Sequence, residues 1–163
     1  LLLAERKSTI RIVENGKRKI LRDDYTGRIE TVNIQAVRAL QDTGHMPVIA
    51  PVAISASGEA LNVDGDRAAA RLAGTVKADK LVILSNVSGL LSDLADPNSY
   101  IPRISEEDID DAINNIARGR MKRKLIAARE ALEAGAKQVI IANGKIEQPI
   151  AKALKGEGTL ING

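Results

Sequence analysis

Two carboxylates and an amide crowd into the stretch Asn62-Val63-Asp64-Gly65-Asp66, directly ahead of an alanine-rich run. Side chains of these types can ligate a cation, cap a helix or hold a polar substrate. Their spacing matches the first, third and fifth positions of an EF-hand calcium loop. That loop also needs glycine at its sixth position and glutamate at its twelfth, where this chain has Arg67 and Ala73. The sequence therefore excludes a calcium loop of this kind.

Helix capping explains part of the stretch. Asp64 or Asn62 can cap a following helix, and acids suit a helix N-terminus electrostatically. Asp66 differs, because it is in helical register with three apolar residues further on, Ala69, Ala73 and Val76. It therefore falls on the face that such a helix buries. A carboxylate held there needs a cationic partner or a ligand, so we predict a site role for Asp66.

A cluster of cations supplies a candidate partner. Four of the five residues from Arg120 to Lys124 are basic, at the start of a predicted helix. Positive charge opposes the helix dipole at that end, which indicates a bound anion. The apolar stripe of this helix consists of Met121, Leu125, Ala128 and Leu132. Lys124 borders the stripe and Arg123 points away from it, so a solvated basic face remains the alternative for Lys122 and Arg123.

The elements that position these residues alternate along the chain. Helical patterns cover 33–43, 68–76, 118–133 and 149–154, and Ser105 to Asp108 has the pattern of a capped helix start. Apolar runs of buried-strand length cover 46–55, 80–85, 138–142 and 159–161. Asn15-Gly16, between the alternating runs 1–13 and 18–22, predicts an N-terminal hairpin. Residues 96–98 (Asp-Pro-Asn) predict a loop.

This alternation predicts an α/β fold with three αβα layers around a mainly parallel sheet. Ligands of such sheets bind at the carboxyl ends of the strands. We therefore expect three segments at one rim: the residues after Ser55, the loop Ser85–Leu91, and Asn143-Gly144. The basic residues Lys17 to Lys19 lie on the hairpin, either as a solvated arm or as a docking patch for an acidic partner.

Composition excludes several classes of protein. The 163 residues fit a single domain, and 24 basic against 21 acidic residues is too even for a nucleic-acid-binding protein. Two Tyr, with no Phe or Trp, provide few platforms for base stacking. The absence of Cys excludes disulfides and thiolate metal sites.

No apolar run is long enough for a membrane helix. We expect a cytoplasmic protein with no metal-ligating residues. Phosphate-loop and dinucleotide-binding fingerprints are also missing.

Four segments together resemble the C-terminal, nucleotide-binding half of the amino acid kinase family, a carbamate kinase-like fold, and in particular its acetylglutamate kinase branch. They occur in family order and span nearly the whole chain: Asn62–Ala69, Leu84–Leu90, Gly119–Lys124 and Gly158–Ile161. The run Met-Lys-Arg-Lys is most similar to kinases acting on aminoadipate or glutamate attached to a LysW-type carrier protein. The resemblance to this branch implies transfer of the γ-phosphoryl group of ATP, with Mg²⁺, to a side-chain carboxylate in arginine or lysine biosynthesis.

The resemblance implies a role for each matching residue. Lys124 matches the lysine that stabilises the transferring phosphoryl group, Asp66 the aspartate that organises the catalytic lysines, and Asn62 the amide that contacts the amino-acid substrate. The nucleotide pocket corresponds to Ser85, Asn86, Val87, Gly89, Leu90, Gly119, Met121 and Lys122.

The family's other phosphate-binding lysine, its glycine-rich loops and much of its substrate site lie in an N-terminal half, for which these residues offer no substitute. The chain opens on Leu1-Leu2-Leu3 as if inside a strand. We therefore expect residues 1–163 to be a single domain of a longer, homo-oligomeric kinase and to be inactive alone. Uridylate, glutamate 5-, carbamate or aspartate kinases, and a non-catalytic nucleotide-binding module, are the alternatives. A NAD oxidoreductase would need the missing fingerprint.

Overall fold

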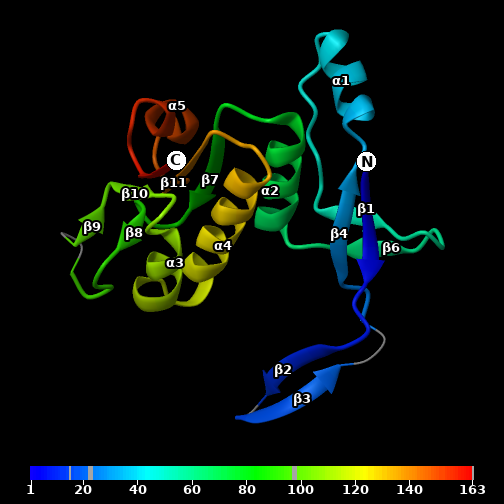
Figure 1. Cartoon of the computed structure of the whole chain (residues 1–163), viewed down its shortest axis with the longest axis horizontal. Coiled ribbons are helices and arrows are strands. Elements are labelled where there is room, and N and C mark those ends of the chain that lie inside the picture. The colour runs from blue at the N-terminus through cyan, green and yellow to red at the C-terminus, as the bar shows by residue number, and fades with distance from the viewer. Residues whose placement is uncertain (15, 22–23, 97–98, 163) are drawn as a thin grey trace. The chain divides into compact units, whose positions relative to one another are not determined.

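The computed structural model describes residues 1–14, 16–21, 24–96 and 99–162. Its strands (Figure 1) are β1 (Leu2–Arg6), β2 (Ile10–Glu14), β3 (Lys17–Leu21), β4 (Gly27–Val32), β5 (Val52–Ile54), β6 (Ala60–Asn62), β7 (Leu81–Ser85), β8 (Leu90–Leu91), β9 (Tyr100–Ile101), β10 (Arg103–Ser105), β11 (Gln138–Asn143) and β12 (Thr159–Asn162). Its helices are α1 (Ile34–Asp42), α2 (Gly65–Val76), α3 (Ile109–Asp111), the π-helical η1 (Ala112–Ile116), α4 (Gly119–Glu133) and α5 (Pro149–Leu154).

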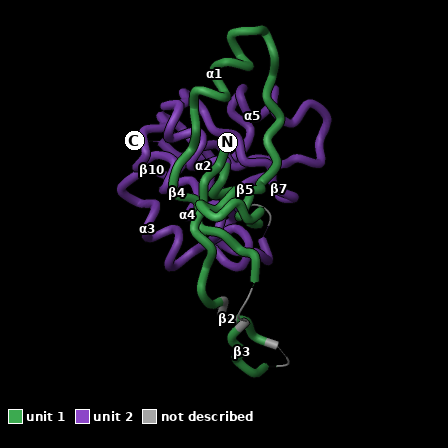
Figure 2. The backbone as a smooth tube through the Cα atoms, turned by 90° about the vertical axis from the view of Figure 1, so that its right-hand side faces the viewer, with its two compact units in different colours: residues 1–68 green, residues 69–163 purple. Residues whose placement is uncertain are grey.

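The chain forms two compact units, Leu1–Ala68 and Ala69–Gly163, and the boundary falls inside α2 (Figure 2). The first unit contains the sheet β4-β1-β5-β6 and the separate hairpin β2-β3. The second contains the sheet β10-β12-β11-β7 and the short hairpin β8-β9. Each unit has its own buried cluster of aliphatic side chains.

The first unit's sheet follows the two-residue period of a strand. Alternate residues of β1 and β5, namely Leu2, Ala4 and Ala53, point into the core with Ile29 and Leu61. Leu3 and Ile54 are register partners in parallel strands, and they lie on the opposite face with 44% and 45% of their surfaces exposed. The core of this unit therefore lies on one side of the sheet, and the other side presents apolar side chains.

The second unit shows the predicted layers around β11. Val139 and Ile141 belong to the cluster that contains Leu125 of α4, whereas Ile140 belongs to a separate cluster with Ala153 of α5. Because successive side chains of a strand point to opposite faces, α4 and α5 cover opposite faces of this strand. The sheet is mixed: β11 pairs parallel with β7 and antiparallel with β12, while β10 pairs parallel with β12. The α/β, αβα fold is confirmed.

Most predicted elements are confirmed within a residue or two. Asn33 caps α1 through its side chain, and Gly44, with φ +79°, follows the end of that helix. Gly135, with φ +109°, follows α4 in the same way. The hairpin β2-β3 forms as predicted, with Gly16 at φ +74° in its turn, although Asn15 lies outside the described residues. Of the predicted loop at 96–98, residues 97 and 98 also lie outside them.

The prediction of one buried strand over 46–55 is wrong. Only Val52–Ile54 is a strand, and the side chains of Met46 and Val48 are 89% and 96% exposed. Pro47 and Pro51 interrupt this run, and proline has no N–H to donate to a strand ladder. Similarly, residues 1–13 form two strands, because β1 ends at Arg6 and pairs with β4 and β5, while β2 begins the hairpin.

The helix predicted to start near Ser105 begins later, at Ile109, and continues into η1. The Ser105 hydroxyl accepts a hydrogen bond from the backbone N–H of Asp108 at 3.2 Å and donates one to its carboxylate at 2.6 Å. Ser105 therefore closes a turn ahead of the helix, as its residue type favours.

Candidate functional site

The carboxyl ends of β7 and β11 lie side by side in the second unit. Asn143 is the register partner of Ser85, and the N–H of Gly144 donates a hydrogen bond to the Ser85 carbonyl at 2.7 Å. Two of the three segments predicted for the rim are therefore neighbours, and the loop Asn86–Leu91 starts there. The third segment, after Ser55, belongs to the first unit.

A buried hydroxyl fixes the far end of this loop. Thr159 is fully buried, and its Oγ1 accepts a hydrogen bond from the N–H of Leu90 at 2.8 Å. The same hydroxyl donates to the carbonyl of Ile101 at 2.7 Å. A Cβ on Gly89 would lie 2.5 Å from Thr159 Oγ1, so only glycine fits between β12 and the loop. The Gly158–Ile161 motif, through Thr159, therefore supports the Leu84–Leu90 motif.

The predicted nucleotide residues of the loop differ in exposure. Asn86 and Val87 are exposed, as is Ser88, and Ser85 is half-buried. Gly89 and Leu90 are buried against the unit's core. The exposed side of the loop is therefore formed by its first residues, while Gly89 and Leu90 fix its course.

The start of α4 reaches this rim through Lys124. Its Nζ donates a hydrogen bond to the carbonyl of Leu84 at 3.5 Å, one residue before the end of β7. Lys124 is half-buried, as are Met121 and Lys122, and Arg123 is exposed. This matches the order that helical periodicity predicts for the basic run. A cation is thus held next to the predicted nucleotide loop.

Gly119 opens α4 with φ +54°, and a Cβ placed on it would have no neighbour within 4 Å. The backbone there can take a conformation that L side chains avoid, and the space beside it is open. Together with Lys124 and the loop, the first turn of α4 offers backbone and ammonium donors. Donors of these kinds suit phosphate oxygens.

The stretch Asn62–Asp66, with its two carboxylates and its amide, lies in the first unit. Asp64 Oδ1 accepts a hydrogen bond from the N–H of Arg67 at 3.1 Å, so Asp64 caps α2. Asp66 sits in the first turn of the helix and is half-buried. Asn62 ends β6 with its side chain exposed. Because Asp66 and Lys124 belong to different units, the pairing of Asp66 with the catalytic lysines stays a prediction.

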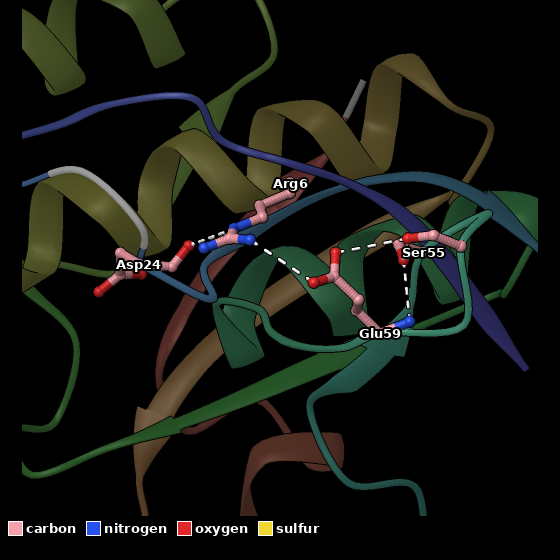
Figure 3. A network of polar contacts seen from close by, with 5 residues as sticks. Arg6, Asp24, Ser55 and Glu59 are labelled. Atoms are coloured by element: carbon pink, nitrogen blue, oxygen red, sulfur yellow. Dashed lines mark hydrogen bonds and ion pairs between the residues drawn. The ribbon is translucent and has the colours of Figure 1, made fainter.

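A polar network in the first unit has no counterpart among the predicted residues. Arg6 lies between the backbone carbonyl of Asp24 and the carboxylate of Glu59, and Ser55 Oγ accepts a hydrogen bond from the N–H of Glu59 (Figure 3). These residues come from three separate segments of the chain and form no motif. A pattern of local spacing could not identify them.

A cavity of about 350 Å³ adjoins the predicted nucleotide loop in the second unit. Its lining includes Ser88, Asn143, Tyr100 and Glu157. Burial raises the pKa of the Tyr100 phenol above its ordinary value, with hydrogen bonding to Gly158 and Thr159 opposing the rise. Tyr100 is therefore neutral at physiological pH. Among the residues that line the cavity, the sequence predicted a position at this rim for Ser88 and Asn143.

Two features are absent from the described residues. No group of three or more His, Cys, Asp or Glu side chains there could hold a metal ion. No helix in the described part of the chain has the length and apolar character needed to cross a membrane.

Residues 5–143 match the amino acid kinase family. This chain is 45% identical to the LysW-aminoadipate kinase of Thermus thermophilus over 162 residues. The match covers 99% of this chain and 60% of that kinase. The acetylglutamate kinase of Methanopyrus kandleri is 38% identical over 99% of this chain and 61% of its own length. The chain thus spans about 60% of these relatives. A carbamate kinase structure from Giardia has the same fold, with a TM-score of 0.73 at 22% identity, covering 99% of this chain and 59% of its own.

Proposed function

This chain belongs to the amino acid kinase family, and we propose that the complete protein transfers the γ-phosphoryl group of ATP to the side-chain carboxylate of an N-blocked acidic amino acid. The product is an acyl phosphate of the kind used in arginine or lysine biosynthesis. The observation that carries the proposal is the position of Lys124, whose Nζ lies 3.5 Å from the Leu84 carbonyl. That position puts an ammonium group beside the loop predicted to hold the nucleotide.

The proposed reaction does not require the protein to transfer a proton. The acceptor carboxylate is already ionised at neutral pH, so no general base is required. Catalysis then consists of positioning the two substrates and stabilising the charge of the transferring group. We assign Lys124 to that charge, Asp66 to organising the catalytic lysines, and Asn62 to the amino-acid substrate. The loop from Ser85 to Leu90 and the start of α4 are assigned to the nucleotide.

Mg²⁺ fits this residue set only as an ion carried by the nucleotide. Mg²⁺ commonly keeps several waters and binds substrate phosphates with one or two carboxylates rather than a protein cage. When bound, MgATP would supply the phosphoryl group and neutralise part of its charge, and this chain's residues would hold and orient it.

The names of the relatives support a proposal for the acceptor class. Relatives at 45% and 44% identity are named LysW-aminoadipate kinases, and one at 38% is an acetylglutamate kinase. We therefore propose glutamate or aminoadipate with a blocked amino group, attached to a carrier protein or free as N-acetylglutamate. Lys17, Arg18 and Lys19 are exposed on the hairpin β2-β3, where an acidic carrier could dock through complementary charge.

A hydroxamate assay on the complete protein tests the proposal. Hydroxylamine traps an acyl phosphate, and the iron complex of the resulting hydroxamate is coloured. Parallel reactions receive N-acetylglutamate, carrier-bound glutamate or carrier-bound aminoadipate, each with and without ATP. We expect an ATP-dependent signal with one or more of these acceptors. Thermal stabilisation by ATP with no hydroxamate from any acceptor would instead indicate a nucleotide-binding module without catalysis.

A further inference from the structure

Arg6, the last residue of β1, contacts three groups of the first unit, and Figure 3 shows its contacts with Asp24 and Glu59. Its Nε donates a hydrogen bond to the backbone carbonyl of Asp24 at 2.9 Å. Its Nη1 forms an ion pair with Glu59 Oε1 at 3.5 Å. Its guanidinium carbon also lies 4.4 Å from the centre of the Tyr25 ring, within the range of a cation–π contact.

The backbone held by Arg6 is the backbone that supports Asn62. The N–H of Asn62 donates a hydrogen bond to the carbonyl of Tyr25 at 2.7 Å. Asn62 also forms a parallel bridge with Thr26. Residues 24–26 therefore connect the guanidinium on one side with Asn62 on the other, and a shift of this segment would move Asn62.

The ion pair reaches the other end of the same strand. Glu59 directly precedes β6, which ends at Asn62. The turn that carries Glu59 is closed on itself, because the N–H of Glu59 donates to Ser55 Oγ at 3.0 Å and the N–H of Ser55 donates to the Glu59 carbonyl at 2.9 Å. Arg6 is thus linked to β6 at both ends, through Glu59 at its start and through Tyr25 at its finish.

Only arginine can make this set of contacts. Its planar guanidinium presents several donors in a fixed arrangement and still offers a face to an aromatic ring, whereas the lysine ammonium is a point charge on a flexible stem. The Arg6 side chain is 30% exposed, so solvent screens its ion pair less than that of a fully exposed residue.

We propose that Arg6 is a positioning residue for the acceptor, which it serves by fixing β6 and the exposed amide of Asn62. The inference rests on the proposed function, since it takes Asn62 to contact the amino-acid substrate. Arg6 acts through Asn62 and is not assigned a contact with either substrate. It is therefore expected to govern binding of the acceptor and not of the nucleotide.

The test compares Arg6→Lys with wild type in the complete protein, using the hydroxamate assay. We expect the KM for the acceptor to rise roughly tenfold, while the KM for ATP stays within about twofold. Arg28→Lys is the matched control, because Arg28 pairs with Glu5 at 2.8 Å in the same sheet with both side chains more than 60% exposed. A control effect equal to that of Arg6→Lys would overturn the inference.

A double-mutant cycle separates positioning from general loosening of the fold. If Arg6 acts through Asn62, then Arg6→Lys in an Asn62→Ala background should change the acceptor KM by less than about twofold. Effects of the two substitutions on the acceptor KM that simply multiply, or an equal rise in the KM for ATP, would contradict the proposal.

Should Arg6→Lys fail to fold, Glu59→Gln gives the same readout, with a smaller rise in the acceptor KM expected. A wild-type protein that yields no hydroxamate would refute the proposed function itself, whereas an active wild type with unchanged variants would refute only the role of Arg6.

Discussion

Asp64 and Asp66 stand two residues apart at the start of α2, yet their surroundings differ. Asp64 is exposed and its carboxylate caps the helix, as its residue type and position predicted. Asp66 is half-buried in the first turn, on the side that the helical period indicated. The cap could be predicted because its hydrogen bond spans three residues. The partner expected for Asp66 is 58 residues further along the chain (124 − 66), and no local pattern specifies such a contact.

Substituting the two carboxylates one at a time should separate stability from turnover. Asp64→Ala removes the cap and should lower the free energy of unfolding by about 1 kcal/mol, with kcat within about twofold of wild type. Asp66→Asn keeps the shape of the side chain but removes its charge, and we expect kcat to fall at least roughly tenfold. Urea unfolding and the hydroxamate assay measure the two effects. An Asp66→Asn protein that loses stability but keeps its turnover would show that Asp66 is only a helix-terminal acid.

Lys124 is the residue on which the proposed mechanism depends most. Removing an ammonium group that stabilises charge in the transition state typically costs a large factor in rate. We therefore predict that Lys124→Ala in the complete protein lowers kcat by at least roughly tenfold, with a smaller change in the KM for the acceptor. Arg123→Ala is the matched control, because Arg123 is the adjacent cation and is exposed. Equal activity of wild type and Lys124→Ala would remove this residue from the mechanism.

At the scale of elements, the sequence was informative where one segment carries its own start and stop signals. Asn33 and Gly44 bracket α1, and Pro149 lies in the first turn of α5. Strand pairing was harder to predict, because it joins segments that are distant in the chain. The run 46–55 has the composition of a buried strand, but burial also needs a partner, and only Val52–Ile54 pairs with β1 and β6. The Arg6 network escaped prediction for the same reason, since its members come from three separate segments.

The contact between β12 and the hairpin β8-β9 supports an element-scale prediction. Thr159→Val keeps the side-chain shape but removes the hydroxyl, so the N–H of Leu90 and the carbonyl of Ile101 lose their partner. A buried group left unsatisfied costs about 1–3 kcal/mol. We expect that loss in the free energy of unfolding, together with a higher KM for ATP, because Leu90 ends the predicted nucleotide loop.

The control for this prediction is Thr75→Val. The Thr75 hydroxyl donates to the carbonyl of Arg71 in its own helix, on an exposed surface. We expect its effect on unfolding to stay within about 0.5 kcal/mol. If Thr159→Val were as mild as this control, Thr159 would not determine the position of the loop.

For the whole molecule, the first unit has an apolar face that its own residues leave exposed. Leu1, Leu3, Val52 and Ile54 are each more than 40% exposed on the sheet. A cavity of about 320 Å³ opens beside them, lined by residues that include Leu1, Val52 and Ile54. Contiguous apolar surface of this kind usually marks a contact with other protein. The relatives are longer than the matched part of this chain, so they contain further residues that could cover such a face.

The last prediction concerns residues 1–163 expressed alone. The family resemblance predicts that the phosphate-binding groups complementing Lys124 belong to an N-terminal half that these residues do not replace. We therefore predict that this chain alone produces no hydroxamate above the level of its own Lys124→Ala variant, whereas the complete protein does. The exposed sheet face should also make the isolated chain bind the dye ANS more strongly than the complete protein does. Turnover by the isolated chain that disappears in its Lys124→Ala variant would show instead that the 163 residues hold a sufficient active site.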